Sequence, residues 1–211
     1  MGTPQMPGRL DQQDVILASG SLARSDMLTA AGIKFRVVPA AVDEAAIREA
    51  LVAGEARIEP ADIAEVLAVA KAEAVSREHR SALVIGADQV LAFGSEIINK
   101  ARGADDARTT LMKLRGQRHQ LHSAVAIALD GEVDWTATDT AELAMRKFSP
   151  RFLEDYLLLE SAHVCQSVGA YRIEGPGIQL FEKIEGDHFT ILGLPLLALL
   201  EELRARGVTA E

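Results

Sequence analysis

The sequence contains a single cysteine, Cys165, among its 211 residues. No internal disulfide is therefore possible, which fits a reducing compartment, and we expect a cytoplasmic protein. Because free cysteines are among the most often buried residues, we predict that Cys165 is a small core residue rather than a nucleophile. Long apolar runs are also absent, although 48% of the residues are hydrophobic. This combination predicts a globular protein without a membrane-spanning segment.

Positive charge is scarce, with 22 Lys and Arg against 31 Asp and Glu and a net charge of −9. This balance argues against a broad nucleic-acid surface, while an anionic small molecule can still bind in a locally basic cleft. No linker rich in proline, serine or glycine divides the chain, so we expect one compact α/β domain over residues 13–208. Residues 1–12 lack the apolar core of a signal peptide, and we expect a frayed leader there.

The most informative stretch lies in the middle of the chain, at residues 83–100. Residues 83–87 form an apolar run typical of a strand buried on both faces, and the run stops at Asp88-Gln89. Ligands bind at the carboxyl ends of strands in open α/β sheets, so we expect a ligand here. Gly94-Ser95 predicts a hairpin that delivers Lys100. From spacing alone, a structural interpretation is as good as a ligand site: Asp88 would cap a turn, and Lys100 would be a solvated charge.

A hydroxyl-rich turn follows the first predicted strand, residues 15–18. Ser19 and Ser21 lie in this turn, and Ser21 is a good N-cap for a helix that ends before Gly32. Backbone donors and the helix dipole at such a turn both favour an anion, so it is a candidate phosphate site. Arg24 in the first turn opposes the dipole, and we interpret its guanidinium as a ligand for phosphate oxygens. The lysine and the spacing of a P-loop are absent.

The next polar residues each have two interpretations. Asp43-Glu44 opens a predicted helix, where acids commonly complement the helix dipole. A carboxylate here can also hold magnesium, because hard divalent ions prefer oxygen ligands. Lys71 lies on a long amphipathic helix predicted over residues 63–76, where a lysine usually faces solvent.

Later segments predict antiparallel strands and a glycine-framed turn. Asp130-Gly131 joins two alternating segments, residues 120–129 and 133–145, and is a strong hairpin signal. Antiparallel strands beside buried parallel-type strands imply a mixed sheet. Residues 169–177 place Glu174 inside a turn where glycines let the backbone approach a ligand, although tight packing requires glycine equally often.

Several blocks of residues, from about residue 14 to residue 206, follow one another in a characteristic order. They are Leu17-Ala18-Ser19 with Ser21 and Arg24, Val42-Asp43-Glu44, Lys71-Ala72, Ile85-Gly86-Ala87-Asp88-Gln89-Val90, Lys100 ahead of Asp106-Ala107, Tyr171 to Gly177, and Gly186-Asp187 leading to Gly193-Leu194-Pro195-Leu196. Taken together, this ordered set resembles the Maf family of nucleoside triphosphate pyrophosphatases.

The resemblance implies an elongated α/β fold, in which a mixed twisted sheet with flanking helices forms two lobes around a deep cleft, similar to inosine triphosphate pyrophosphatase. It also implies hydrolysis of a nucleoside triphosphate to the monophosphate and pyrophosphate with a divalent metal, magnesium or manganese. By resemblance, Asp88 is the general base that activates water, and Glu44 together with Asp88 is associated with the metal. The positions implied to hold the triphosphate are Ser19, Arg24, Lys71 and Lys100. Such chemistry depends on positioning and charge neutralisation.

Three positions bear on the choice of base. In family members that prefer thymidine or uridine triphosphates, the central block reads Asp-Thr and the late turn carries Gln. Here Gln89 and Glu174 occupy these positions, as in the branch associated with 7-methyl-GTP, which we expect to be the substrate. Ala23 occupies a third such position, in a turn that departs from the family's Ser-Pro-x-Arg pattern. Ala101 after the hairpin lysine and Ser25 instead of a second arginine are further departures.

Two other functions stay open from the sequence. One is a dTTP or UTP pyrophosphatase, which Gln89 and Glu174 argue against. The other is a non-catalytic, nucleotide-binding regulator of septum formation. An enzyme is favoured by the presence of Asp88, Glu44, Lys71 and Lys100 together, because a protein that only binds nucleotides needs no general base. The expected partners are the nucleotide and, from the resemblance, a second copy in a homodimer, with no nucleic acid and no membrane.

Overall fold

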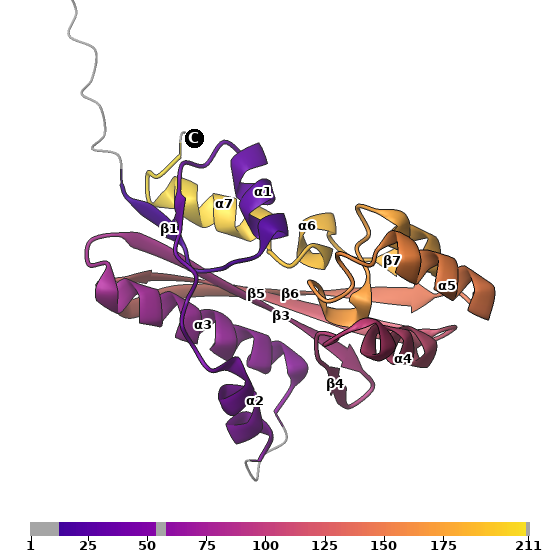
Figure 1. The fold of residues 1–211 in the computed structure, drawn as a ribbon. Helices are drawn as coiled ribbons and strands as arrows, with labels where there is room; N and C mark the ends of the chain where they lie inside the picture. The colour runs from indigo at the N-terminus through magenta and orange to yellow at the C-terminus, as the bar shows by residue number, and fades with distance from the viewer. Residues whose placement is uncertain (1–12, 54–57, 210–211) are drawn as a thin grey trace, which may run out of the picture.

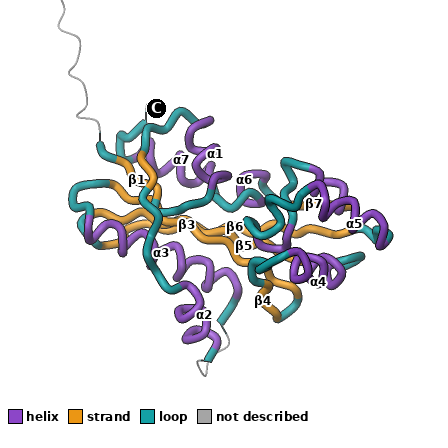
Figure 2. The backbone as a smooth tube through the Cα atoms, in the orientation of Figure 1, coloured by secondary structure: helices purple, strands orange, loops and turns teal. Residues whose placement is uncertain are grey.

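The computed structural model describes residues 13–53 and 58–209 (Figure 1). The expected leader, residues 1–12, lies outside this part of the chain. Figure 2 shows the helices packed around one extended sheet. In chain order the elements are β1 (Val15–Leu17), α1 (Leu22–Ala30), β2 (Arg36–Val37), α2 (Glu44–Val52), α3 (Pro60–Glu78), β3 (Leu83–Phe93), β4 (Glu96–Ile98), α4 (Ala104–Leu114), β5 (Arg118–Leu129), β6 (Glu132–Met145), α5 (Pro150–Leu159), η1 (Val168–Ala170), η2 (Pro176–Leu180), β7 (Phe181–Glu185), α6 (His188–Ile191) and α7 (Leu196–Ala205).

Within the described residues, seven strands form one mixed sheet in the order β2-β1-β3-β5-β6-β7, with β4 paired to β3. β1 runs parallel to β2 and β3, whereas β5 is antiparallel to β3 and β6, and β7 is antiparallel to β6. Asp130 and Gly131 close the β5–β6 hairpin with φ of 53° and 90°, the left-handed pair that a two-residue hairpin turn requires. The predicted mixed α/β sheet is confirmed.

Helices cover both faces of this sheet (Figure 1). α3 lies on one face, and α1 and α7 lie on the other. Ala72 of α3 packs in one buried cluster with Val90 of β3, while Leu28 of α1 and Leu199 of α7 pack in another with Ile85. Because successive strand side chains point to opposite faces, even-numbered residues of β3 lie on the α3 side. Odd-numbered residues lie on the other side, where Ile85 packs with α1 and α7 and Leu91 packs in the cluster that includes α4 and α5.

Gly86 lets α3 approach β3 unusually closely. A Cβ added at Gly86 would lie 2.2 Å from the carbonyl oxygen of Ala68 and 2.6 Å from the backbone nitrogen of Ala72. Since both atoms belong to the helix backbone, neither can turn aside as a flexible side chain would. Glycine at this position therefore sets the distance between α3 and the strand that carries Asp88.

Two predictions are wrong in detail. The strand expected to stop at Asp88-Gln89 continues to Phe93, because β5 pairs with it without a break from Val84 to Ala92. Asp88 therefore lies in the middle of β3 rather than at a strand end. Cys165 is exposed rather than buried, since it lies in the turns after α5. None of the helices in the described ranges has the length and apolar character that crossing a membrane requires.

Candidate active site

Asp88 and Lys71 meet where α3 packs on β3. Asp88 shares the α3-facing side of the strand with Gly86, two residues earlier. The Nζ atom of Lys71 donates a hydrogen bond of 2.5 Å to Oδ1 of Asp88. The exposed fractions of the lysine and aspartate side chains are only 9% and 6%. Lys71 is thus held in a buried ion pair and does not face solvent.

Glu44 adds a second carboxylate to this pair. Asp43 caps α2 through its side chain and so begins the helix at Glu44. The Oε1 atom of Glu44 lies 2.8 Å from Nζ of Lys71, so the lysine bridges the two carboxylates. Partial burial acts to raise the pKa of Glu44, but the hydrogen bond from Lys71 and the charges of nearby cations outweigh it. The pKa of Glu44 consequently lies below its usual value.

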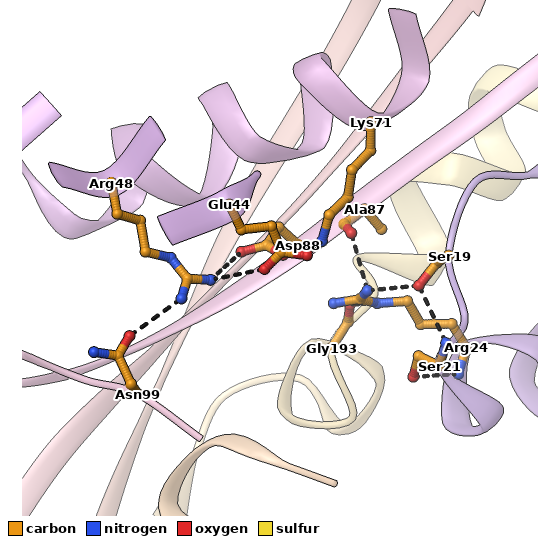
Figure 3. A network of polar contacts seen from close by, with 10 residues as sticks. All are labelled: Ser19, Ser21, Arg24, Glu44, Arg48, Lys71, Ala87, Asp88, Asn99 and Gly193. Carbon is orange, nitrogen blue, oxygen red and sulfur yellow. Dashed lines mark hydrogen bonds and ion pairs between the residues drawn. The ribbon is translucent and has the colours of Figure 1, made fainter. Parts of the chain in front are cut away.

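Arg48, which none of the sequence motifs singles out, bridges the same two carboxylates from another direction (Figure 3). Its Nη2 atom lies 3.3 Å from Oε2 of Glu44 and 3.4 Å from Oδ2 of Asp88. Its Nη1 atom donates to Oδ1 of Asn99 at 3.2 Å. The four-residue spacing from Glu44 predicts at most a surface pair on one helix. The contact with Asp88 depends on the tertiary fold, so the sequence pattern does not reveal it.

Ser19 and Arg24 form the adjoining half of the site. Ser21 caps α1 by accepting a hydrogen bond from the backbone nitrogen of Arg24, as expected. The guanidinium of Arg24 donates to Oγ of Ser19 at 2.9 Å and to the carbonyl oxygens of Ala87 at 2.9 Å and Gly193 at 2.8 Å. All these acceptors are neutral. Figure 3 shows Arg24 and Arg48 on opposite sides of the Asp88 carboxylate.

Burial and charge both act on Arg24. Removal from water lowers the pKa of its guanidinium, while the charges of Asp88 and Glu44 act in the opposite direction. With neutral oxygens as its hydrogen-bond partners, Arg24 brings a positive charge into the site that the direct contacts do not cancel. A buried guanidinium of this kind favours an anionic ligand.

Lys100 lies two residues after β4, as the predicted hairpin requires. Partial loss of hydration lowers the pKa of its ammonium group, as do the charges of Arg24 and Lys71, whereas Glu44 and Asp88 raise it. These interactions place Lys100 within the electric field of the same cluster. The structure therefore groups the predicted residues of the phosphate and metal sites around Asp88.

Gln89 points to the opposite face of β3 from Asp88. Its amide nitrogen donates to Oγ of Ser123 at 3.0 Å and to the carbonyl oxygens of Thr190 at 3.1 Å and Ile191 at 3.0 Å. These bonds connect β3 to α6. Ile191, the last residue of α6, lies two residues before Gly193, whose carbonyl oxygen accepts a hydrogen bond from Arg24. The contacts give Gln89 a role in positioning α6, and its contact with a nucleobase stays a prediction.

Ala23 and Glu174 line a common cavity of about 550 Å³. The cavity walls come mainly from apolar residues of α1, α6 and α7, such as Met27, Leu192 and Leu196, with Asp26 as a second acid. Two residues of the lining are chain neighbours of the site, since Ala23 precedes Arg24 and Leu192 precedes Gly193. Two of the three predicted base-choice positions are thus brought together, and Gln89 lies outside the lining.

A divalent metal fits the carboxylates of this site, although no group of three or more metal-binding side chains occurs in the described part of the chain. Magnesium is usually bound through one or two carboxylates together with substrate phosphates. Asp88 and Glu44 provide such a pair, since Lys71 and Arg48 each contact both. The chemistry of the donors, hard oxygens beside a basic cluster, is what a metal–phosphate complex requires.

Fold and site together define an α/β protein with a candidate anion-binding site, in which basic side chains surround two carboxylates. The sequence profile described as "Maf-like protein" matches residues 14–206. The chain belongs to this family, which confirms the resemblance inferred from the ordered blocks.

Curated relatives match over nearly their whole length. A Mesorhizobium japonicum protein named "7-methyl-GTP pyrophosphatase" is 49% identical, over 92% of this chain and 97% of its own. Proteins named "Nucleoside triphosphate pyrophosphatase" from Caulobacter vibrioides and Paramagnetospirillum magneticum are 47% and 50% identical. The first covers 92% of this chain and 96% of its own length, and the second covers 91% and 98%.

Proposed function

We propose that this protein is a nucleoside triphosphate pyrophosphatase that hydrolyses 7-methyl-GTP to 7-methyl-GMP and pyrophosphate in the cytoplasm. The observation that carries the proposal is the position of Asp88, a buried carboxylate contacted by Lys71 and Arg48 and close to the phosphate-binding candidate Arg24. The names of the relatives support the reaction class. The acidic side chain of Glu174 in the lining of the neighbouring cavity supports a substrate with a positively charged base.

In the proposed reaction, Asp88 accepts a proton from a water molecule as the water oxygen attacks the α-phosphorus. The new bond joins the water oxygen to the α-phosphorus. The bond from the α-phosphorus to its bridging oxygen breaks, and its electron pair leaves with pyrophosphate. Arg24, Lys71 and Lys100 offset the charge on the phosphate oxygens, which is the main requirement of phosphoryl chemistry.

We assign the metal to the two carboxylates, Asp88 and Glu44. When bound, magnesium or manganese would supply positive charge to the phosphate oxygens. Glu44 lies in the first turn of α2 and is only partly exposed, so it can reach the ligand without leaving its helix. Ser19 lies within 2.9 Å of the Arg24 guanidinium and would orient this group toward the triphosphate.

The cavity beside Arg24 is the proposed base pocket. Its apolar walls suit the faces of a purine, and Glu174 and Asp26 are the acidic residues of its lining. A carboxylate can accept hydrogen bonds from the amino and imino edge of guanine and can offset the positive charge that methylation adds. Ala23 contributes a small side chain from α1 to this lining.

Pyrophosphate release from a panel of nucleotides tests the proposal: 7-methyl-GTP, GTP, dTTP, UTP and CTP, each with magnesium or manganese. We expect selective cleavage of 7-methyl-GTP and loss of activity on chelation of the metal. Preference for dTTP or UTP would keep the enzyme class but reject our interpretation of the cavity. Tight binding without cleavage of any nucleotide would favour the regulator instead. Light scattering on the same sample tests the expected homodimer.

A further inference from the structure

Arg48 has no place in the motifs of the site, yet it contacts both carboxylates. We infer that Arg48 binds the pyrophosphate end of the substrate, the β- and γ-phosphates, and that before substrate arrives it neutralises Asp88 and Glu44 together with Lys71. This inference rests on the proposed function and adds a binding residue to the same site. It also assigns the direction in which the triphosphate lies.

The contacts of Arg48 are those of a group that can change partners. Its 3.3 and 3.4 Å distances to Glu44 and Asp88 exceed the roughly 2.7–2.9 Å of strong charge-assisted bonds. Its Nε atom is buried and has no hydrogen-bond acceptor among the residues that the structure describes. A buried, unpaired N–H of a guanidinium is costly. A phosphate would supply the missing acceptor, because it accepts several bonds from one guanidinium.

The balance of charge also favours an anion at Arg48. Among the residues that the structure describes, the basic side chains of the cluster are Arg24, Arg48, Lys71 and Lys100, whereas the carboxylates facing them are Asp88 and Glu44. Positive charge is therefore in excess before any metal binds. A divalent cation held by Asp88 and Glu44 would add to this excess, and phosphate oxygens would then be the better partners for Arg48.

The order of groups along the site gives the direction of the substrate. The lining of the proposed base cavity includes Ala23, the chain neighbour of Arg24, and Asp88 lies between Arg24 and Arg48 (Figure 3). A nucleotide with its base in the cavity and its α-phosphate at Asp88 must extend its remaining phosphates away from Arg24. Arg48 and its partner Asn99 lie on that far side.

This placement gives Arg48 a role in the reaction. Negative charge develops on the leaving pyrophosphate oxygen as the bond to the α-phosphorus breaks. The guanidinium donors of Arg48 would stabilise that charge. At the same time, departure of Nη2 from Oδ2 frees the Asp88 carboxylate to accept the proton of the attacking water.

The test compares binding of the two products, which requires no turnover. We would titrate inorganic pyrophosphate and, separately, the nucleoside monophosphate into the magnesium-containing protein by calorimetry. For Arg48→Gln we expect pyrophosphate affinity to fall roughly ten- to hundredfold, the range of hydrogen bonds to a charged group, while monophosphate affinity changes by less than about twofold. Arg48→Lys keeps the charge but loses the planar fork, so its pyrophosphate affinity should be intermediate.

Arg77→Gln is the matched control, because Arg77 also pairs with a glutamate four residues away on a helix but is 63% exposed. Its product affinities should equal those of the wild type. Unchanged pyrophosphate affinity in Arg48→Gln, or equal weakening of both products, would overturn the inference. If Arg48→Gln melts at a clearly lower temperature than the wild type, Arg48→Lys replaces it in the test. The inference then requires that Arg48→Lys weakens pyrophosphate binding and leaves monophosphate binding unchanged. Failure of the wild type to cleave any nucleotide would instead reject the proposed function, independently of these affinities.

Discussion

The ammonium group of Lys71 lies 2.5 Å from a carboxylate oxygen of Asp88 in a buried environment. Removing one partner of a buried ion pair leaves the other charge uncompensated, at a cost of about 3–5 kcal/mol. Lys71 has a second carboxylate, Glu44, at 2.8 Å. Lys71 therefore keeps a charged partner when the charge of Asp88 is removed, so we expect an Asp88 variant to fold.

Asp88→Asn preserves the shape of the side chain and removes the proposed base. We expect turnover of the preferred nucleotide to fall by about a hundredfold or more, the usual contribution of general-base catalysis. Most nucleotide binding should be retained, because Arg24, Lys71 and Lys100 are unchanged and Glu44 still offers a carboxylate to the metal. Steady-state kinetics and calorimetric titration of the same preparation separate the two effects. Near-normal turnover would move the base elsewhere, with Glu44 as the next candidate.

Glu44 gives a prediction for pH. Its pKa in the folded protein lies below the usual 4.5, so the charged carboxylate stabilises the fold above about pH 4.5, and this contribution is lost as the pH falls through the lower folded value. Glu44→Gln should therefore be less stable than the wild type at pH 7, by no more than about 1 kcal/mol because the side chain is 40% exposed. The difference should shrink below pH 4.5.

Urea unfolding at pH 7 and at several values below pH 4.5 measures this difference. Glu49→Gln, at an exposed position on the same helix, is the control and should match the wild type throughout. A constant deficit of Glu44→Gln at all pH values would show that packing, rather than charge, is responsible.

Local signals in the sequence predicted most elements and several residues of the site. Ser21 and Asp43 cap the helices that follow them, and Asp130-Gly131 closes the expected hairpin. These features depend on a few neighbouring residues, so a single sequence contains enough information to place them.

Features that depend on distant partners were missed. β3 continues through Asp88 because β5, more than 30 residues later, supplies its hydrogen bonds. Arg48 reaches Asp88 across 40 residues of chain. The amide of Gln89 is held by backbone carbonyls of α6, about a hundred residues away. No helical or strand periodicity indicates such pairings.

Gly86→Ala tests whether the packing of α3 on β3 controls the site. The added Cβ would clash with the backbone at Ala68 and Ala72, so the helix must move, with an expected loss of about 1–3 kcal/mol of stability. Lys71 precedes Ala72, and the shift should also weaken its contact with Asp88 and lower turnover. Urea unfolding and kinetics measure both effects.

Gly103→Ala is the matched control for this substitution. A Cβ at Gly103 meets nothing within 4 Å, and the extended backbone there accepts any residue. Its stability and turnover should stay close to those of the wild type. Normal turnover in Gly86→Ala would indicate that Lys71 keeps its contact with Asp88 when α3 moves. The ion pair would then not depend on the close approach of the helix.

Glu174→Gln tests the base pocket. The carboxylate of Glu174 lines the cavity beside Arg24, and a cationic, methylated guanine would lose an opposite charge when it is replaced. We expect the ratio of kcat/KM for 7-methyl-GTP over GTP to fall about tenfold, corresponding to roughly 1.4 kcal/mol. Turnover of GTP should fall less, because GTP loses only part of the hydrogen bonding to the carboxylate and its base carries no added charge.

Asp26→Asn is the control, since Asp26 is the other acid in the same lining and is exposed on α1. If Glu174 faces the base and Asp26 does not, only Glu174→Gln lowers the ratio. A lower ratio in Asp26→Asn alone would assign base recognition to α1. Unchanged ratios in both variants would place the methylated base outside this cavity. The order of base, α-phosphate and pyrophosphate along the site would then have to be assigned anew from the affinities of the Arg48 variants for pyrophosphate and monophosphate.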